Sequence, residues 1–330
     1  MKDLYHTVNP IIRIKENELL SPETFRQLID ADSFQRIADI LRPTVYGKHL
    51  TPQFEFEFEK ILNEELLSTY QDMIELTPNS EIVWLYTMRY TFHNLKVLTK
   101  AERIQENYDY LFLPDGFFTM EEMKRAIQTG SSSKLPEKVL KSIHDVEEYF
   151  KESNILQAID VIYDRRFLKE QRRLVEELGD PEILEIIIHF INLTNIITAA
   201  RCILQQRSYG FMSAVLSSSG SISRESFLEY ANRPLHEFTA FIASTEYSDL
   251  LSSAFTADEI DFLKLDLLKD NYIQSLYEKA QTTAFGPLPL LSFMNAKDIE
   301  ITNLRLIIVG KRSGFTNEQI RERMRDVYEL

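Results

Sequence analysis

Residues 300–314 read EITNLRLIIVGKRSG: a polar lead-in, a run of large aliphatic side chains and a Gly-Lys-Arg-Ser-Gly ending. In isolation this pattern is typical of a buried strand that leads into a phosphate-binding loop. That loop requires the motif G-x-x-x-x-G-K-[ST]. Here Arg305 takes the place of the first glycine, and Arg312 follows Lys311 where serine or threonine is required. The stretch is therefore not expected to bind a nucleotide.

The same pattern recurs twice earlier in the chain. Each copy contains an asparagine triplet, and a polar residue stands three positions before the asparagine. The triplets are Asn94-Leu95-Lys96 with Thr91, Asn195-Ile196-Ile197 with Asn192, and Asn303-Leu304-Arg305 with Glu300. Positions i and i+3 lie on one face of a helix. We therefore predict that each triplet belongs to a long helix with a polar stripe. The third helix is predicted to end at Gly310, with Lys311 and Arg312 beside the negative end of its dipole.

A pair of short helices precedes each set of long ones. In the pair, a Ser or Thr caps the first helix, an acid lies in its first turn and Phe or Met points inward. The matching residues are Ser21, Glu23, Phe25 and Thr44-x-Tyr46 in the first copy, Thr119, Glu121, Met123 and Tyr149 in the second, and Ser223, Glu225, Phe227 and Thr245-x-Tyr247 in the third. These repeats predict three similar helical domains at 1–104, 105–208 and 209–330.

Composition and periodicity favour an all-α fold. The 330 residues include only 9 Gly and 11 Pro, and 44% are hydrophobic. Helices are predicted over residues 4–19, 52–76, 78–104, 136–150, 155–178, 181–206, 258–283 and 287–310, with a last one after Thr316 whose capping box includes Gln319. The alternating stretch Phe54–Glu59 is typical of a strand. We assign it to a helix because it continues without a break into a helical pattern.

The charge balance excludes several classes of partner. The chain has 37 basic and 51 acidic residues, a net charge of −14. Nucleic acids need a basic surface to neutralise their phosphates, and anionic lipid headgroups would repel this chain. Residues 183–203 form the most apolar window but contain Glu185, His189 and Arg201. Since central charges oppose insertion into a bilayer, we interpret this window as a buried helix.

No catalytic or metal-binding motif is visible in the sequence. Cys202 is the single cysteine, so no disulfide can form within the chain and a reducing compartment is favoured. The six histidines do not have the spacing of metal ligands. The N-terminal residues lack the apolar stretch of a signal peptide. We expect no cofactor.

Taken together, the motifs resemble one known family, which comprises the C subunits of prokaryotic V/A-type rotary ATPases and their counterpart in the vacuolar enzyme, the d subunit. The resemblance covers nearly the whole chain and rests on Ile11-Ile12-Arg13, Leu19-Leu20-Ser21, Thr44-x-Tyr46, the three Asn triplets, Asp164 with Phe167, Phe285-Gly286-Pro287, Leu290, Lys297, Glu300-Ile301, Gly310-Lys311 and Ile320-Arg321. Pro43 and Asp298 depart from the family pattern.

This resemblance implies a fold, a place and a set of partners. The fold would be an all-helical funnel of three domains in pseudo-threefold arrangement. The chain would be monomeric in isolation and would not insert into the bilayer. In its complex it would lie at the cytoplasmic face of the membrane, between the proteolipid ring and the central shaft, whose components are of D and F type. It would have no active site and would transmit torque for H⁺ or Na⁺ transport.

Two interpretations of the polar stripes remain open. The side chains either form hydrogen bonds between core helices or line a polar axial socket that receives the shaft. The candidate socket residues are Arg13, Arg89, Thr91, Asn94, Lys96, Asn192, Asn195, Arg201, Glu300, Asn303 and Arg305. A helical-repeat scaffold without a rotary role is the alternative function, although solenoid repeats are usually shorter. An all-α enzyme is disfavoured because no catalytic cluster is visible.

Overall fold

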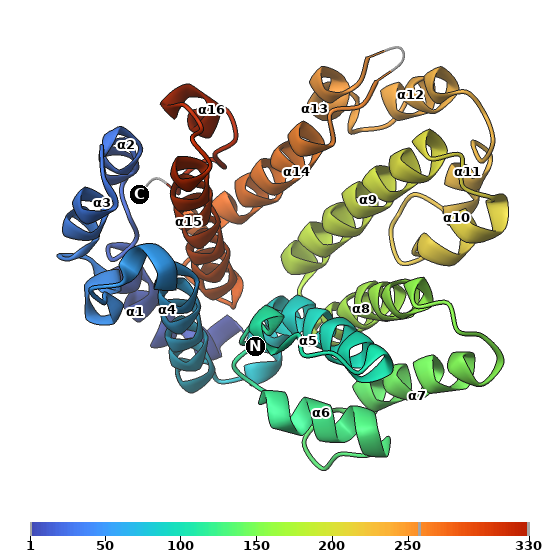
Figure 1. The fold of residues 1–330 in the computed structure, drawn as a ribbon, viewed down its shortest axis with the longest axis horizontal. Coiled ribbons are helices and arrows are strands. Elements are labelled where there is room, and N and C mark those ends of the chain that lie inside the picture. The colour runs from blue at the N-terminus through green and yellow to red at the C-terminus, as the bar shows by residue number, and fades with distance from the viewer. Residues whose placement is uncertain (1, 257–258, 329–330) are drawn as a thin grey trace. The chain divides into compact units, whose positions relative to one another are not determined.

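The computed structural model describes residues 2–256 and 259–328, and helices dominate it (Figure 1). Within these ranges no β-strand forms, although Phe255 and Ile260 make an isolated antiparallel bridge. The all-α prediction is confirmed. The chain divides into two compact units, which are Met1–Val83 with Asp266–Leu330 (unit 1) and Trp84–Leu265 (unit 2). The three-domain boundaries and the threefold funnel stay predictions.

Unit 1 combines both ends of the chain around two long helices. Its elements are η1 (Lys2–Tyr5), α1 (Val8–Glu16), α2 (Pro22–Asp30), α3 (Phe34–Leu41), η2 (Val45–His49), α4 (Phe54–Leu76), most of α14 (Phe262–Tyr277), η5 (Glu278–Thr282), α15 (Leu288–Arg312) and α16 (Asn317–Arg321). Helices α4 and α15 pack along each other, α1 packs on α15, and α16 contacts α2. Most residues of α15 are buried, which makes this helix the core of unit 1.

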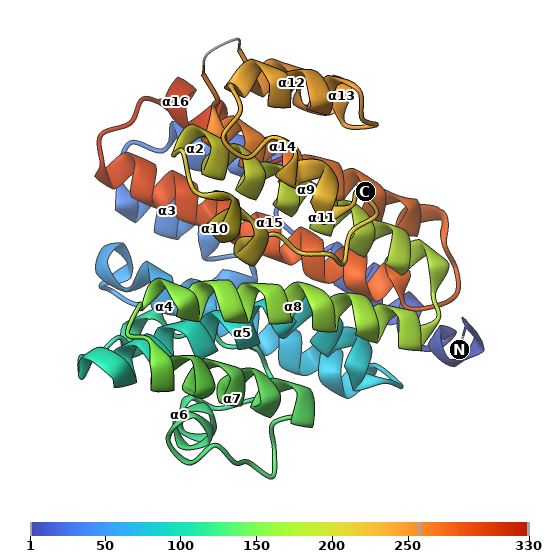
Figure 2. The same ribbon diagram turned by 90° about the vertical axis from the view of Figure 1, so that its right-hand side faces the viewer.

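Unit 2 is built around three long helices and two groups of short ones. Its elements are α5 (Ser80–Ile104, which begins in unit 1), η3 (Asp109–Leu111), α6 (Met120–Thr129), α7 (Glu137–Glu152), α8 (Gln157–Leu178), α9 (Pro181–Leu204), α10 (Tyr209–Val215), α11 (Arg224–Leu228), α12 (Leu235–Ala243), α13 (Ser248–Leu251), η4 (Ser252–Ala254) and the start of α14 (Phe262–Tyr277). Helix α8 packs against both α7 and α9, and α6 lies beyond α7 (Figure 2).

The predicted caps of the short helices are confirmed at atomic level. The hydroxyls of Ser21, Thr119 and Ser223 accept backbone N–H groups at the first turns of α2, α6 and α11. Thr316 and Gln319 form the expected capping box before α16. These side chains satisfy amide groups that have no partner inside the helix. The alternating stretch after Gln53 is helical from its first residue, as predicted.

The predicted end of the third long helix is wrong. Helix α15 continues through Gly310 to Arg312, and Gly314 is the glycine with a left-handed backbone, at φ 75°. Gly310 instead allows close packing, because a Cβ there would lie 3.0 Å from Cγ1 of Ile320. The sequence alone does not distinguish these two roles of glycine, because one role needs close packing against a neighbour and the other needs a left-handed backbone.

Two predicted helices are much shorter than expected, whereas the bounds of the other long helices differ from the prediction by one or two residues at most. The helix at 4–19 is interrupted before α1, because Pro10 cannot donate to the carbonyl four residues earlier and its ring clashes there. The helix predicted at 258–283 extends from Phe262 to Tyr277 and is followed by the 3₁₀ helix η5. The guanidinium of Arg13 donates hydrogen bonds to the carbonyl oxygens of Ala280 and Thr283 in this region. Its predicted first residue, Asp258, lies outside the described residues.

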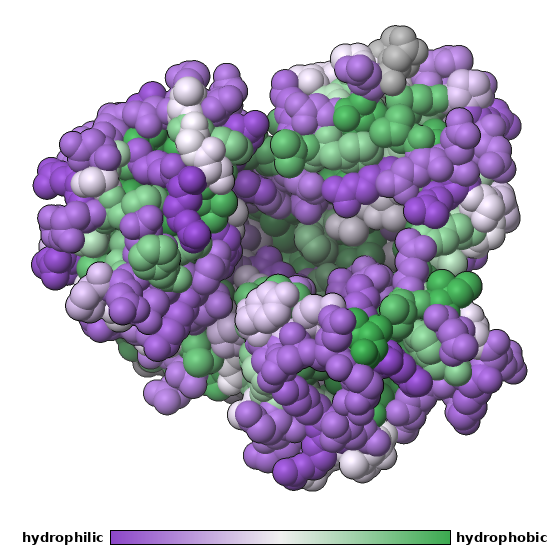
Figure 3. Space-filling model, in the orientation of Figure 1, coloured by the Kyte–Doolittle hydropathy of each residue, from purple (hydrophilic) through white to green (hydrophobic). Residues whose placement is uncertain are grey.

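The most apolar helix, α9, is a core helix of unit 2. Among the described residues it is the one helix that is long and apolar enough to cross a membrane by length and composition. However, 67% of its apolar window is buried against other parts of the protein. The core helix of a globular protein meets the same length and composition criterion. The burial of α9 agrees with its interpretation as a buried helix. Hydrophilic side chains cover most of the face drawn in Figure 3.

Candidate functional site

The three stripe asparagines make the same contact in each copy. Each carboxamide binds both the N–H and the C=O of one residue in the segment that follows its helix. Asn94 binds Leu113 at 2.8 and 2.6 Å, Asn195 binds Ser217 at 3.0 and 2.8 Å, and Asn303 binds Arg325 at 2.9 and 3.0 Å. All three asparagines are buried. We call this two-bond contact the asparagine clamp.

The polar residue three positions earlier anchors the backbone that leads into a short helix. Asn192 Oδ1 accepts the amides of Ser221 and Ile222 at 3.0 and 3.2 Å. Glu300 Oε2 accepts the amide of Leu20. In each case the anchored segment leads directly into a capped short helix, α11 or α2.

Thr91 reaches its segment through a second side chain. Its hydroxyl donates to Asp115 Oδ2 at 2.7 Å. Asp115 Oδ1 in turn accepts the amides of Phe117 and Phe118 at 2.9 Å, just before the cap Thr119. The polar stripes therefore tie each long helix to the entry of a short helix pair.

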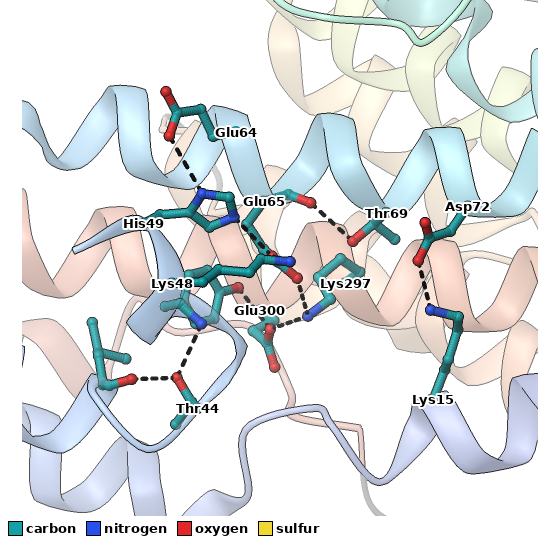
Figure 4. A network of polar contacts seen from close by, with 12 residues as sticks. Lys15, Thr44, Lys48, His49, Glu64, Glu65, Thr69, Asp72, Lys297 and Glu300 are labelled. Atoms are coloured by element: carbon teal, nitrogen blue, oxygen red, sulfur yellow. Dashed lines mark hydrogen bonds and ion pairs between the residues drawn. The ribbon is translucent and has the colours of Figure 1, made fainter.

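Unit 1 adds a buried ionic network around Glu300 (Figure 4). Lys297 on α15 lies 2.7 Å from Glu300 Oε1 and 3.6 Å from Glu65 Oε1 on α4. Side-chain exposure is 2% for Lys297, 3% for Glu300 and 5% for Glu65. Tyr46 donates its hydroxyl to Glu300 at 2.6 Å. One buried cation thus balances two buried carboxylates that belong to different helices.

The edge of this network is partly exposed. Lys48 lies 3.0 Å from Glu65, and the ring of His49 lies 3.3 Å from both Glu64 and Glu65. Burial, followed by the nearby charge of Glu300, holds the pKa of Tyr46 well above its usual range. Tyr46 therefore stays protonated and serves as a fixed hydrogen-bond donor.

The remaining predicted residues contact nearby side chains in their own unit. Arg13 forms a two-bond ion pair with Glu16 at 2.7 and 2.8 Å. The guanidinium of Arg89 lies 4.2 Å from the ring centre of Tyr86, and that of Arg201 lies 5.2 Å from the ring centre of Phe262. Lys96 binds Asp164 at 2.6 Å, and Arg305 binds Glu59 at 2.9 Å. Their predicted role in lining a socket stays a prediction.

Several residues of these networks were missed by the site prediction. Asp115, Glu65 and Tyr46 were not among the candidates, and Lys297 entered only through the family resemblance. Two signals pointed to Tyr46: its place in the family resemblance and its match to Tyr247, whose hydroxyl accepts a hydrogen bond from Asn192 at 3.0 Å. Lys297 and Glu65 resemble ordinary charges on helix surfaces, so pattern alone could not identify them.

The chemistry of these residues is structural within the described part of the chain. No group of three or more His, Cys, Asp or Glu side chains there could hold a metal ion. Burial raises the pKa of the Cys202 thiol, which works against a reactive thiolate. The clamps and the ionic network instead fix helices and loops in position.

Asp115 should make stability depend on pH. Burial raises the pKa of this carboxyl above its usual 3.8, so the folded state holds the proton more tightly than the unfolded state. Its contribution to stability is thus greatest at low pH and falls as the pH rises above about 4. We expect Asp115→Asn, which keeps an oxygen acceptor, to remove this loss. Urea unfolding of both proteins between pH 4 and 7 measures it, and parallel stability profiles would contradict the assignment.

Comparison with known proteins agrees with the motifs. The family described as "ATP synthase (C/AC39) subunit" matches residues 8–323. The chain belongs to this family. It is 52% identical to the C subunit of the V-type sodium ATPase of Enterococcus hirae, over 99% of both chains. It is also 23% identical to the C subunit of the A-type ATP synthase of Methanocaldococcus jannaschii, over 96% of this chain and 85% of that protein.

Membership in the C/AC39 family confirms the resemblance seen in the sequence. The chain is a structural component of a V/A-type ATPase and not its catalytic subunit. A second archaeal relative, from Methanothermobacter thermautotrophicus, is 23% identical over 95% of this chain and 86% of its own length. The clamps and ionic network are therefore the internal framework of a C/AC39 protein.

Proposed function

We propose that this chain is the central-stalk component that couples the rotor shaft of a V/A-type ATPase to the proteolipid ring in the membrane. It would transmit torque for ATP-linked transport of H⁺ or Na⁺. Its partners would be the D-type and F-type shaft proteins and the ring, at the cytoplasmic face. The observation that carries the proposal is the 52% identity, over 99% of both chains, to the C subunit of a V-type sodium ATPase.

The internal contacts support a role that requires stiffness. A torque-transmitting part must deform little under load, and close-packed interiors have low compressibility. The clamps join α5, α9 and α15 each to the segment that follows it, through two hydrogen bonds. The Lys297 network adds a charged hydrogen bond to Glu300 within α15, which is stronger than a neutral one, and an ion pair at 3.6 Å that links α15 to Glu65 on α4.

Co-purification separates the proposal from its alternative. We expect a tagged copy of the chain, expressed with its complex, to retain both the shaft proteins and the proteolipid ring. The isolated chain should show no ATP hydrolysis. A helical-repeat scaffold without a rotary role is the alternative, and recovery of the chain with other proteins but neither of these partners would favour it.

Charge reversal tests whether the polar stripe contacts the shaft. Arg305→Glu would place two acids together, since Arg305 binds Glu59. The double variant Glu59→Lys with Arg305→Glu restores an attractive pair while it keeps the reversed charge at 305. If the stripe lines the socket, both variants should weaken shaft binding by about tenfold or more, that is by about 1.4 kcal/mol.

Lys96 offers a matched test, because Lys96→Glu can be combined with Asp164→Lys. Titration calorimetry against the purified shaft proteins gives the affinity, and thermal unfolding gives the stability. Rescue of shaft binding by the charge-swapped pairs would mean that only internal stability had changed. That result would reject the socket interpretation and leave the family assignment untouched.

A further inference from the structure

The three clamps differ in how their segments continue. In unit 2, the clamped residue and the anchored amide belong to one unbroken segment. Leu113 leads to Phe118, and Ser217 leads to Ile222. Each segment is thus held at one end by an asparagine clamp, at the other by the polar anchor, and by the peptide chain on both sides.

In unit 1 the corresponding link is broken. Asn303 clamps Arg325, near the C-terminal end of the described chain. Glu300 anchors Leu20, near the N-terminal end. Leu20 and Arg325 therefore belong to different segments of the chain. In unit 2 the two equivalent held positions belong to the same segment. The third module is completed by two chain segments that meet only through side chains.

Residues 323–328, which we call the strap, lie in this broken link. The side chain of Arg325 donates to Asp270 at 3.1 Å, and the amide of Asp326 donates to Asn271 at 3.0 Å. Tyr328 is 6% exposed and donates its hydroxyl to Glu16 at 3.0 Å. Glu300, the polar anchor of this module, binds the amide of Leu20 and not an amide of the strap.

The strap also supports the entry of α2. Val327 and Tyr328 line the same small internal cavity as Leu20, Phe25 and Glu300. Phe25 is the buried anchor of α2, and Leu20 directly precedes its cap. Departure of the strap would expose the apolar side chains of this cavity to water and uncover the Leu20–Glu300 bond. The strap and α2 are therefore expected to loosen together.

From these contacts we propose that the strap is a detachable closure of unit 1. Its release opens the strap and the α2–α3 pair as one local unit, while α4, α15 and unit 2 stay folded. When the clamp of unit 2 opens, the anchor a few residues along the same segment keeps that segment close to its site. The anchor of unit 1 holds Leu20 on a different segment and does not retain the strap. The closure is a conformational device of unit 1 and does not depend on the proposed rotary role.

Native-state hydrogen exchange of the full-length protein tests this closure. In the wild type, amides of the strap and of α2 should exchange at matching rates across low denaturant concentrations. They should exchange faster than amides of residues 217–222. We expect Asn303→Ala to speed exchange in both the strap and α2 by about tenfold or more, because both clamp bonds are lost. Asn195→Ala is the matched control in unit 2, which should speed exchange in residues 217–222 and leave the strap and α2 unchanged.

Tyr328→Phe keeps the test valid if Asn303→Ala does not fold. It removes one hydroxyl bond to Glu16 and should speed exchange in the strap and α2, with no change in unit 2. Strap amides that exchange as slowly as residues 217–222 in the wild type would overturn the proposal. So would a variant in which the strap loosens while α2 keeps its protection.

Discussion

Replacement of Lys297 by methionine is expected to lower the free energy of unfolding by about 3–5 kcal/mol. The variant keeps the apolar length of the side chain but leaves Glu65 and Glu300 buried without their shared cation. Uncompensated charge in a protein interior is costly because desolvation is no longer offset by attraction. Urea unfolding monitored by circular dichroism measures the change.

Two further variants isolate the charge effect. Lys60→Met removes an exposed lysine whose distance to Glu64 is 3.8 Å, and it should change stability by less than about 1 kcal/mol. Adding Glu300→Gln to Lys297→Met removes the charge of Glu300, whose partner was Lys297, and should recover part of the loss, whereas Glu65 keeps Lys48 at 3.0 Å in both variants. An equal effect of Lys297→Met and Lys60→Met would show that the buried network does not stabilise unit 1.

The second large effect is expected at the clamp of unit 2. Asn195→Ala leaves both the N–H and the C=O of Ser217 without partners, and Ser217 is 3% exposed. Each unsatisfied buried group costs about 1–3 kcal/mol, so we expect a total loss of about 2–4 kcal/mol. Thermal and urea unfolding should agree on this value.

The control for this clamp is an asparagine on the surface. Asn17 is exposed and donates to the carbonyl of Arg13, so Asn17→Ala should cost no more than about 0.5 kcal/mol. Asn195→Asp is informative because it keeps the acceptor for the Ser217 amide but cannot donate to the carbonyl when ionised. If Asn195→Ala left the free energy of unfolding nearly unchanged, water molecules would have to replace the two clamp bonds.

Much of the local structure could be predicted from the sequence. Ser21, Thr119 and Ser223 cap helices because a hydroxyl can satisfy free amides of the first turn, a requirement that depends only on neighbouring residues. The equivalence of Asn94, Asn195 and Asn303 was also visible, since their spacing from a preceding polar residue repeats.

The partners of those asparagines could not be predicted. Each clamp binds backbone atoms, so the clamped position accepts any side chain and is occupied by Leu113, Ser217 and Arg325 in the three copies. A contact made to the main chain leaves no signature in the sequence of the contacted residue. The helix end was misplaced for a related reason, because Gly310 is required by its contact with Ile320 and not by its backbone angle.

The sequence by itself determined the all-α class, the capped starts of the short helices, the repeated polar stripes and the family. These features depend on residues close together in the chain or on patterns that repeat along it. Only the tertiary structure decided that Lys297 is buried between two carboxylates and that Leu20 and Arg325 meet at the same helix. Burial and long-range pairing depend on which helices pack together, and that packing is a property of the whole fold.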